Sequence, residues 1–567
     1  MVKPFVYASL MSAALLALLL GGCGSDKKKG EADPTASAVR IDNSNCTSAC
    51  HAGTVSSVAS ALTGASIPTD WAASRHATTG AADCQDCHGG GSLHWGLGPI
   101  PIPDPDASLT CTAVCHANMP PPHTNSITAG ANYPASFINS QNIGQCGICH
   151  NPHNPTTLMP INVQWASTGK GDVNAAPWAN REFKTSGHNG NPAVSTASDC
   201  VRCHTTTGFI NYISSNFANV RAWGVATDKT KETLQCNACH DQTYNFASQR
   251  SLGAATAYYN YSSRNTKKLL VNRVYPDIGK SNLCVICHVG RENGETLAAV
   301  AALPASGVQF VNYTSQAFIN SHYLTGGATV FGVSAYAFPT QAYAGPSTHA
   351  GAEAPAAGTQ GPCVSCHMQR TVDIAGVTTG LQPSHLFRPE FIPAGFCAGC
   401  HSVVEPNDTA EVAAFQAGYD SALLALKVIL KENSFRQMFW QSRNPYFFTS
   451  ASATAPSLVK WHSLVSPVID VNESGQRNLG AAFNYNLFAH DPGGFAHNAT
   501  YVKQVVFDSI DWLDDNVLPL NGSVVAAINA LTYADEINPA TGGVFTAGEI
   551  AAQKAAAIAY LNGGARP

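Results

Sequence analysis

Apolar residues are distributed unevenly along the chain, and their pattern separates three parts. Near the N-terminus an uninterrupted apolar run extends from Val6 to Leu20, just after Lys3. The run is too short to span a bilayer as a helix, and it is typical of a secretory signal peptide. In the long middle part, the proline-rich segments 99–103 and 120–122 predict extended chain rather than helix.

Periodic apolar residues return only after residue 405. From 408 to 440 they recur at a spacing of three and four, which predicts one long amphipathic helix. A second helix is predicted after Asn498, and a third after Thr546, whose partner Glu549 completes a capping box. We therefore expect residues 406–567 to form a mainly helical region that packs against the rest of the protein.

The composition is unusual for a protein with a large polypeptide core. Only 12% of the residues are charged, and 48 glycines and 33 prolines interrupt regular structure. A large bound cofactor could supply the apolar mass that the middle part lacks. The net charge of −5 is small and does not indicate a nucleic-acid partner.

One motif repeats nine times between Cys46 and His401. Two cysteines are separated by a short gap, and a histidine follows the second one directly. The gap is two residues in seven copies and three residues in the copies at 46–51 and 111–116. The nine copies use eighteen of the nineteen cysteines. They are Cys46, Cys50 and His51; Cys84, Cys87 and His88; Cys111, Cys115 and His116; Cys146, Cys149 and His150; Cys200, Cys203 and His204; Cys236, Cys239 and His240; Cys284, Cys287 and His288; Cys363, Cys366 and His367; and Cys397, Cys400 and His401.

This motif is the attachment signature of haem c. The two sulfurs form thioethers with the porphyrin vinyl groups, and the adjacent histidine binds the iron as its proximal ligand. Structural zinc sites need paired CxxC knuckles without a histidine after each, and disulfides give no reason for the nine histidines. We therefore predict nine covalent haems, seven on CxxCH motifs and two on CxxxCH motifs.

The histidines outside the motifs are sufficient in number to complete bis-histidine ligation, with two to spare. Of twenty histidines eleven remain after the motifs, and nine distal ligands are needed. Paired histidines favour electron transfer, whereas an open iron position permits substrate chemistry. The candidate distal ligands are His76, His94, His123, His153, His188, His322, His349, His385 and His497. We expect His462 and His490 to be the spare ones.

Local sequence suggests how two groups of these ligands are presented. A serine lies two residues before His76 and His188, and an aromatic residue lies five before each. We expect the aromatic ring to pack on a porphyrin and the serine to orient the imidazole. His153 follows His150 too closely to reach the opposite face of the same haem, so we expect it to bind the iron of a neighbouring haem.

The nineteenth cysteine gives the expected location. The sequence Leu20-Gly21-Gly22-Cys23 resembles the lipobox of bacterial lipoproteins, so Cys23 is the expected lipidated first residue of the mature chain. Gly24 at the next position is the pattern expected for sorting to the outer membrane. We expect residues 1–22 to be the signal peptide, 23–45 a flexible tether, 46–405 the nonahaem region and 406–567 the haem-free region.

The motif density, the lipobox and the histidines together resemble the outer-surface multihaem c-type cytochromes of dissimilatory metal-reducing bacteria. The resemblance covers roughly Cys23 to Leu513. It implies irregular loops and short α-helices wrapped around the haems, with little β-structure. It also implies a lipid-anchored protein of the outer membrane, on its periplasmic face or at the cell surface. The implied partners are periplasmic or outer-membrane redox proteins, a porin–cytochrome conduit and an external electron acceptor.

Two further resemblances bear on function. Residues 483–501, with His497 before Asn498, resemble a segment of multihaem nitrite-reductase-type cytochromes in which a histidine before Asn-Pro supplies a distal ligand; the proline is absent here. The alternative function is thus a reductase of nitrite, hydroxylamine or a sulfur oxyanion with one open haem. Ammonia-forming nitrite reductases often carry a CxxCK motif, and this sequence has none. The sequence favours a non-enzymatic electron carrier and leaves the reductase open.

Overall fold

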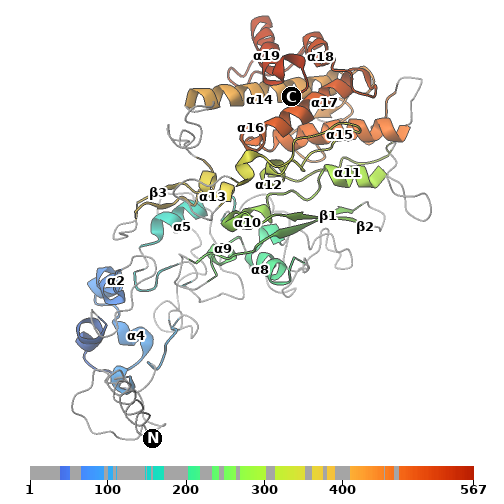
Figure 1. Cartoon of the computed structure of the whole chain (residues 1–567). Helices are drawn as coiled ribbons and strands as arrows, with labels where there is room; N and C mark the ends of the chain where they lie inside the picture. The colour runs from blue at the N-terminus through green and yellow to red at the C-terminus, as the bar shows by residue number, and fades with distance from the viewer. Residues whose placement is uncertain are drawn as a thin grey trace, which may run out of the picture.

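The computed structural model describes residues 39–51, 65–94, 100–105, 110, 147, 150–154, 157–171, 202–217, 233–241, 248–262, 268–301, 313, 315–351, 361–373, 380–389, 409–452, 454–464 and 471–567. In these residues helices and loops dominate, and the strands form three two-stranded sheets. The prediction of helix and loop with little β-structure is confirmed for this part of the chain. Figure 1 shows small elements at the N-terminal end and long helices gathered at the C-terminal end.

The elements before residue 409 are short. The helices are η1 (Asn45–Cys50), α2 (Ile67–Ala73), α3 (Arg75–Thr78), α4 (Cys84–His88), η2 (Gly91–Leu93), α5 (Met159–Ala166), α8 (Thr206–Ser214), α9 (Cys236–Cys239), η6 (Gly279–Ser281), α10 (Asn282–Val285), α11 (Gly294–Ala301), α12 (Gly326–Val330), η7 (Thr348–Gly351) and α13 (Gly361–His367). The strands pair antiparallel: β1 (Ala255–Ser262) with β2 (Lys268–Tyr275), β3 (Arg370–Val372) with β4 (Gln382–Pro383), and β5 (Phe439–Trp440) with β6 (Phe447–Phe448).

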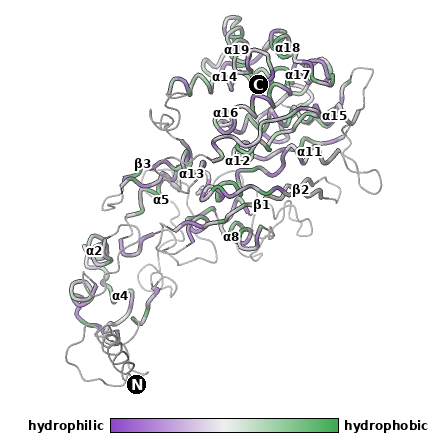
Figure 2. Tube along the Cα trace, in the orientation of Figure 1, coloured by the Kyte–Doolittle hydropathy of each residue, from purple (hydrophilic) through white to green (hydrophobic). Residues whose placement is uncertain are grey.

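The C-terminal helices form the larger of two hydrophobic cores. They are α14 (Thr409–Glu432), α15 (Val471–Ala489), α16 (Gly494–His497), α17 (Ala499–Asp515), α18 (Val524–Ala530) and α19 (Ala547–Tyr560), followed by the short η9 (Asn562–Gly564). Leu426 and Leu430 of α14 and Val506 and Ile510 of α17 are fully buried among them. Hydrophobic and hydrophilic residues alternate along these helices, as expected when one face of each is buried (Figure 2).

Two of the three predicted helices are found where the sequence placed them. Asn498 caps α17 by accepting a hydrogen bond from the Tyr501 amide, and Thr546 with Glu549 forms the capping box of α19. The predicted helix from 408 to 440 ends earlier, at Glu432, because the Asn433 side chain accepts from the amides of Phe435 and Arg436. Its carboxamide also binds the Leu513 carbonyl, which fixes this turn against α17.

Helix α14 is, among the described residues, the one helix whose length and hydropathy would suit a membrane crossing. Half of its most apolar window is buried inside this core.

The sequence did not predict α15. Its buried positions mix asparagines with apolar residues such as Leu479 and Phe483, so the helical period of hydrophobic positions is obscured. Asn478 accepts from the Trp512 indole and donates to the Trp461 carbonyl, and Asn484 bonds both the amide and the carbonyl of Tyr336. These bonds satisfy buried amides, which would otherwise be costly to bury.

The larger core extends into residues that precede the predicted boundary at 406. Leu297, Tyr313, Tyr336 and Phe338 are buried against the C-terminal helices. The aromatic-rich stretch after residue 310 therefore packs against the C-terminal helices in its described part. A second, smaller core surrounds the β1–β2 hairpin, where the hydroxyls of Tyr259 and Tyr275 are 2.5 Å apart.

Candidate haem-binding sites

The described motifs occupy single helical turns. The motif at 84–88 forms α4, and the motifs at 236–240, 284–288 and 363–367 lie on or beside α9, α10 and α13. Residues three apart on a helix lie on the same side of it, so each turn directs both cysteines toward one edge of a planar ligand. The histidine that follows extends the same turn. The N–H of His240 donates to the Cys236 carbonyl over 2.8 Å, and His288 donates to Cys284 over 3.0 Å.

The first long-gap motif keeps the same hydrogen bond by means of a wider turn. Residues Asn45–Cys50 form a π-helical turn, and the N–H of His51 donates to the Cys46 carbonyl over 3.2 Å. A π-turn contains about one residue more than an α-turn, which matches the extra residue between Cys46 and Cys50. The relation of the histidine to the first cysteine is therefore the same in both kinds of motif.

Five motif histidines each lie opposite one histidine from outside the motifs. The ring centres are 6.2 Å apart for His51 and His94, 6.4 Å for His88 and His153, 6.1 Å for His204 and His322, 6.4 Å for His240 and His385, and 6.2 Å for His367 and His497. Every described pair of histidine rings joins one proximal and one distal candidate.

The common distance equals that of two imidazoles on one metal ion. A metal–imidazole bond is about 2.0 Å, and the nitrogen of a five-membered ring lies about 1.1 Å from its centre. Two rings on opposite sides of one iron therefore have centres about 6.2 Å apart. Other aromatic pairs in this structure range down to 4.5 Å, so direct packing does not impose one value.

The donor set fits haem iron better than a bare metal ion. In the described part of the chain, no three His, Cys, Asp or Glu side chains converge as ligands of an ion. Two imidazoles alone do not complete a zinc site, whereas a porphyrin supplies four further nitrogens. Burial raises the pKa of the Cys84 and Cys239 thiols to about 12, which is opposite to what a metal-binding or catalytic thiolate needs.

Burial favours the neutral, metal-binding form in three of the paired imidazoles. Burial lowers the pKa of His153, His204 and His385 to about 4. In His88, His240, His367 and His385, Nδ1 lies 2.9–3.2 Å from a backbone carbonyl oxygen, of Ile102, Ser248, Phe387 and Pro383 respectively. Donation from Nδ1 leaves the Nε2 lone pair for a metal, and such partners orient metal-binding histidines in general.

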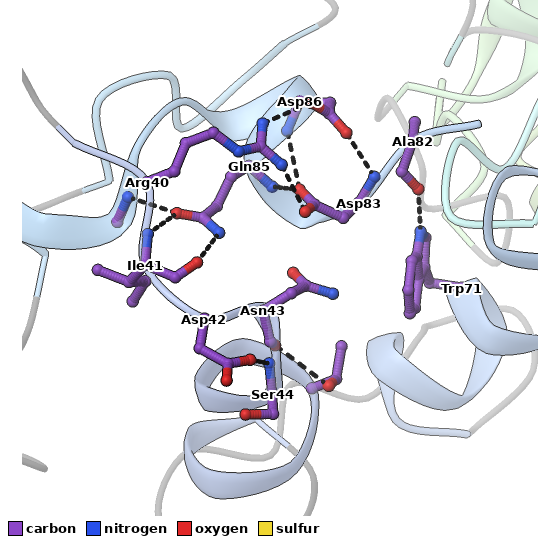
Figure 3. A network of polar contacts seen from close by, with 12 residues as sticks. Arg40, Ile41, Asp42, Asn43, Ser44, Trp71, Ala82, Asp83, Gln85 and Asp86 are labelled. Carbon is purple, nitrogen blue, oxygen red and sulfur yellow. Dashed lines mark hydrogen bonds and ion pairs between the residues drawn. The ribbon is translucent and has the colours of Figure 1, made fainter. Parts of the chain in front are cut away.

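In two pairs the distal histidine lies a few residues after a different motif from the one it faces. His153, three residues after His150, lies against His88 of an earlier motif, and His94, six residues after His88, lies against His51. The two segments are also tied together by polar contacts (Figure 3). The Arg40 guanidinium binds Asp83 and Asp86, and the Gln85 carboxamide bonds both backbone groups of Ile41. The 39–51 segment is thereby held on α4.

Cysteines of different motifs meet in three places. Cys46 is hydrogen-bonded to Cys84, Cys203 to Cys287, and Cys284 to Cys363. The motifs at 200–204, 284–288 and 363–367 therefore form one contiguous group. Successive motifs are neighbours in space here even where 74 residues of chain separate His288 from Cys363.

His497 comes from the helical C-terminal region. Its Nδ1 lies 2.9 Å and 3.1 Å from the two carboxylate oxygens of Asp491. Burial opposes the charge of His497, but the charge and hydrogen bond of Asp491 outweigh burial and raise its pKa. A Cβ added at Gly326 or Gly493 would lie within 2.8 Å of the His497 ring, so both glycines are needed for its close fit.

The remaining described candidates occupy defined places. His349 Nδ1 lies 2.8 Å from the Ala496 carbonyl oxygen, and His150 Nδ1 lies 3.4 Å from the Asn162 amide. His76 is half-buried on α3. His288 is half-buried, and it belongs to none of the five described imidazole pairs. The serine before His76 does not orient the imidazole: Ser74 instead donates to the Trp71 carbonyl and caps α3.

The two histidines expected to be spare lie in the C-terminal region. The His490 ring contacts Tyr323, Trp440 and Tyr446, and its Nδ1 lies 2.7 Å from the Asn486 carbonyl oxygen. The Nδ1 of His462 is buried without a hydrogen-bond partner.

The side chain of Cys50 is not described. The predicted site residues that lie outside the described residues are Cys23, Cys111, Cys115, His116, His123, Cys146, Cys149, His188, Cys200, Cys397, Cys400 and His401.

The sequence did not predict Asp491, the two glycines or the backbone carbonyls that bind Nδ1. Asp491 lies next to a proline and two glycines, which marked the segment as a turn. A backbone acceptor leaves no trace in residue identity, because every residue carries one.

Comparison with known proteins agrees with this geometry. No protein-family model and no solved structure matches the chain. The C-type polyheme cytochrome OmcB of Geobacter sulfurreducens is 27% identical in an alignment that covers 95% of this chain and 98% of OmcB. The C-type polyheme cytochrome OmcC of the same organism is 32% identical over 60% of this chain and 46% of OmcC. The repeated motifs and the imidazole pairs, which are spaced as on one metal ion, agree with these matches. The chain is therefore a homologue of the polyheme c-type cytochromes OmcB and OmcC.

Proposed function

We propose that this protein transfers electrons through nine covalently attached haems c, each ligated by two histidines. The observation that carries the proposal is the set of five imidazole pairs whose centres lie 6.1–6.4 Å apart. Bound haem supplies one-electron iron redox chemistry. The chain attaches each porphyrin through two cysteines, fixes both imidazoles and keeps the iron away from water.

The ligand assignment follows from the pairs. Five motifs take His94, His153, His322, His385 and His497 as distal ligands, in the order of their proximal histidines His51, His88, His204, His240 and His367. Four proximal candidates remain, namely His116, His150, His288 and His401. Four distal candidates also remain, namely His76, His123, His188 and His349. With the two spare histidines, His462 and His490, six histidines are left for four irons, so the supply allows complete bis-histidine ligation.

The contacts between cysteines support a continuous electron path. A thioether joins the porphyrin at its edge, so haems whose cysteines touch would meet edge to edge. Cys203 with Cys287 and Cys284 with Cys363 would connect three haems in this way. Ligation across motifs by His94 and His153 would bring a further group of haems together at the N-terminal end. Close edges favour rapid electron transfer because tunnelling falls steeply with distance.

Ligation across motifs can be tested directly. If His153 binds the haem of Cys84 and Cys87, then His153→Ala should convert that one haem from low spin to high spin. The haem of Cys146 and Cys149 should keep its spectrum, although His153 follows it in sequence. A spectrum and redox titration unchanged at every haem would contradict the assignment.

We further propose a lipid anchor at Cys23 and a location at the outer membrane. The lipobox-like sequence ending at Cys23 supports the anchor, and the match to OmcB over nearly its whole length supports a similar role. The partners would be periplasmic or outer-membrane redox proteins, or a porin–cytochrome conduit, and an external acceptor such as a metal oxide. Cys23→Ser should move the holoprotein from the membrane fraction to the soluble fraction; retention in the membrane would contradict the anchor.

The decisive experiment combines haem counting with electron paramagnetic resonance (EPR) of the matured, oxidised protein. Pyridine haemochrome and intact mass should give nine haems, and EPR should show low-spin iron throughout. A count of seven would mean that the two long-gap motifs are empty. A persistent high-spin signal would instead identify an open haem, as a reductase requires. His288 is the described proximal candidate at which that outcome would be examined first.

A further inference from the structure

Asp491 distinguishes one imidazole pair from the others. In the His240–His385 pair both Nδ1 atoms face neutral backbone carbonyls, and in the His88–His153 pair His88 Nδ1 does so. In the pair of His367 and His497, the distal Nδ1 faces both oxygens of a carboxylate at 2.9 Å and 3.1 Å. Asp491 is 4% exposed, so little water screens its charge.

The carboxylate is held in place from three sides. It accepts hydrogen bonds from the Thr329 hydroxyl and the Gly493 amide. The Tyr419 hydroxyl on α14 donates to the Asp491 carbonyl oxygen over 2.8 Å. The ring of His497 cannot tilt away, because it fits closely against Gly326 and Gly493. Such a fixed acceptor is an arrangement that tunes a metal ligand rather than a chance surface contact.

We propose that Asp491 lowers the reduction potential of the haem carried by Cys363 and Cys366, and makes it more reducing than the haem of Cys236 and Cys239, whose two histidines both face backbone carbonyls. This inference rests on the proposed bis-histidine ligation. A carboxylate on Nδ1–H increases the electron donation of the imidazole and places a buried negative charge near the iron. Both effects stabilise the ferric state, which carries one more positive charge than the ferrous state.

The positive charge of Lys170 acts on the same haem in the opposite direction to Asp491. Its ammonium lies 4.1 Å from the centre of the Phe387 ring, and the Phe387 carbonyl accepts the hydrogen bond of His367 Nδ1. A cation on the proximal side stabilises the ferrous state and acts against Asp491. Removing the charge of either residue should therefore shift the reduction potential of this haem, in opposite directions for the two residues.

The test is a redox titration of the matured full-length protein, followed by EPR. Asp491→Asn keeps the size and a hydrogen-bond acceptor but removes the charge, so one haem should shift to a more positive potential. Lys170→Gln should shift that haem to a more negative potential. Asp511→Asn is a matched control, because Asp511 is also fully buried. Its carboxylate accepts hydrogen bonds from the amides of Gly522 and Ser523 and from the Ser523 hydroxyl, just before α18. This control should leave every potential unchanged. His497→Ala identifies the haem by removing its low-spin signal.

The outcomes separate this inference from the function on which it rests. Nine low-spin haems with titrations that superimpose for the wild type and Asp491→Asn would overturn the role of Asp491 alone. Missing covalent haem in the wild type would overturn the proposed function. If Asp491→Asn does not fold, EPR-monitored titration of the wild type decides: the signal lost in His497→Ala should be reduced at a lower potential than the signal lost in His385→Ala, and the reverse order would contradict the proposal.

Discussion

At the scale of single residues, the orientation of the two imidazoles differs between sites. The ring planes lie within 9–27° of each other in four of the described pairs, but His204 and His322 are inclined by 65°. His322 has a left-handed backbone with φ of +65°, which is uncommon outside glycine and asparagine. The neighbouring Tyr323 ring contacts the His322 ring at 5.4 Å and helps to hold this orientation.

This difference predicts two kinds of EPR signal. Near-parallel imidazoles donate into one iron d orbital and split two otherwise equal levels, which gives a rhombic low-spin spectrum. Nearly perpendicular imidazoles donate into both levels, which leaves them close in energy and gives one large g value. We expect the haem of His204 and His322 to show the second kind of signal, and His322→Ala to remove it. If His322→Ala removed a rhombic signal instead, this result would contradict the angle between the two rings.

At the scale of elements, the wider turn of η1 lets a motif with one extra residue keep the same relation between its first cysteine and its histidine. The His51 amide reaches the Cys46 carbonyl just as His240 reaches Cys236, although one more residue lies between them. Helix geometry therefore compensates for the irregular spacing. The same account applies to the other long-gap motif, at 111–116, only as a prediction, since that motif lies outside the described residues.

If the 46–51 motif carries haem, Cys46→Ala should weaken attachment there as Cys84→Ala does at a regular motif. In each variant, the haem at the altered motif should either stay attached through a single thioether or be lost. Mass spectrometry after extraction with acidified organic solvent would report the number of covalent haems. A haem count and pyridine haemochrome spectrum identical to the wild type in Cys46→Ala, with a change in Cys84→Ala, would mean that the long-gap motif is empty.

Helix α15 depends on glycine where it meets the preceding region. A Cβ at Gly480 would lie 2.3 Å from the Tyr336 ring, and one at Gly475 would lie 2.4 Å from Tyr313. Glycine disfavours helix, but here it lets two buried tyrosines approach the helix backbone. Packing against residues 313–344 thus decides the helix, with the side chains of Asn478 and Asn484 closing the interface.

We predict that Gly480→Ala destabilises the protein by about 1–3 kcal/mol, because the extra methyl group overpacks the core against Tyr336. Gly548→Ala on α19 is the matched control: its Cβ would meet no atom within 4 Å, and alanine favours helix. That variant should be neutral or more stable by up to about 1 kcal/mol. Thermal unfolding followed by circular dichroism measures both, and equal melting temperatures for the two variants would contradict the packing argument.

At the scale of the whole molecule, the C-terminal region belongs to the array of paired histidines. Its core includes Leu297 and Phe338 from the preceding part, and it supplies His497 opposite His367. The description of residues 406–567 as a haem-free region that packs against the others is therefore incomplete. Loss of this region would remove a candidate ligand as well as a packing partner.

We expect His497→Ala to produce one high-spin haem while the covalent haem count stays constant, because the cysteines and His367 remain. His490→Ala serves as the control, since His490 lies in the same region among Tyr323, Trp440 and Tyr446 but opposite no motif histidine of the described residues. The control should keep all low-spin signals. A high-spin signal in His490→Ala but not in His497→Ala would reverse the assignment of ligand and spare.

The sequence by itself predicted the attachment chemistry, because covalent chemistry needs particular side chains at fixed local spacing. The cysteine–histidine motifs, the capping box at Thr546 and the cap at Asn498 are all local in this sense. The sequence also supplied the set of candidate distal histidines, and it predicted that His153 does not serve the haem of His150.

Only the tertiary structure decided which histidine faces which. His322 lies 118 residues from His204 and His497 lies 130 from His367, and no local period relates them. The structure likewise decided that Asp491 rather than a carbonyl binds His497, and that buried asparagines and glycines form α15. These features arise from contacts between distant segments, and the residue types involved have weak or contrary local preferences.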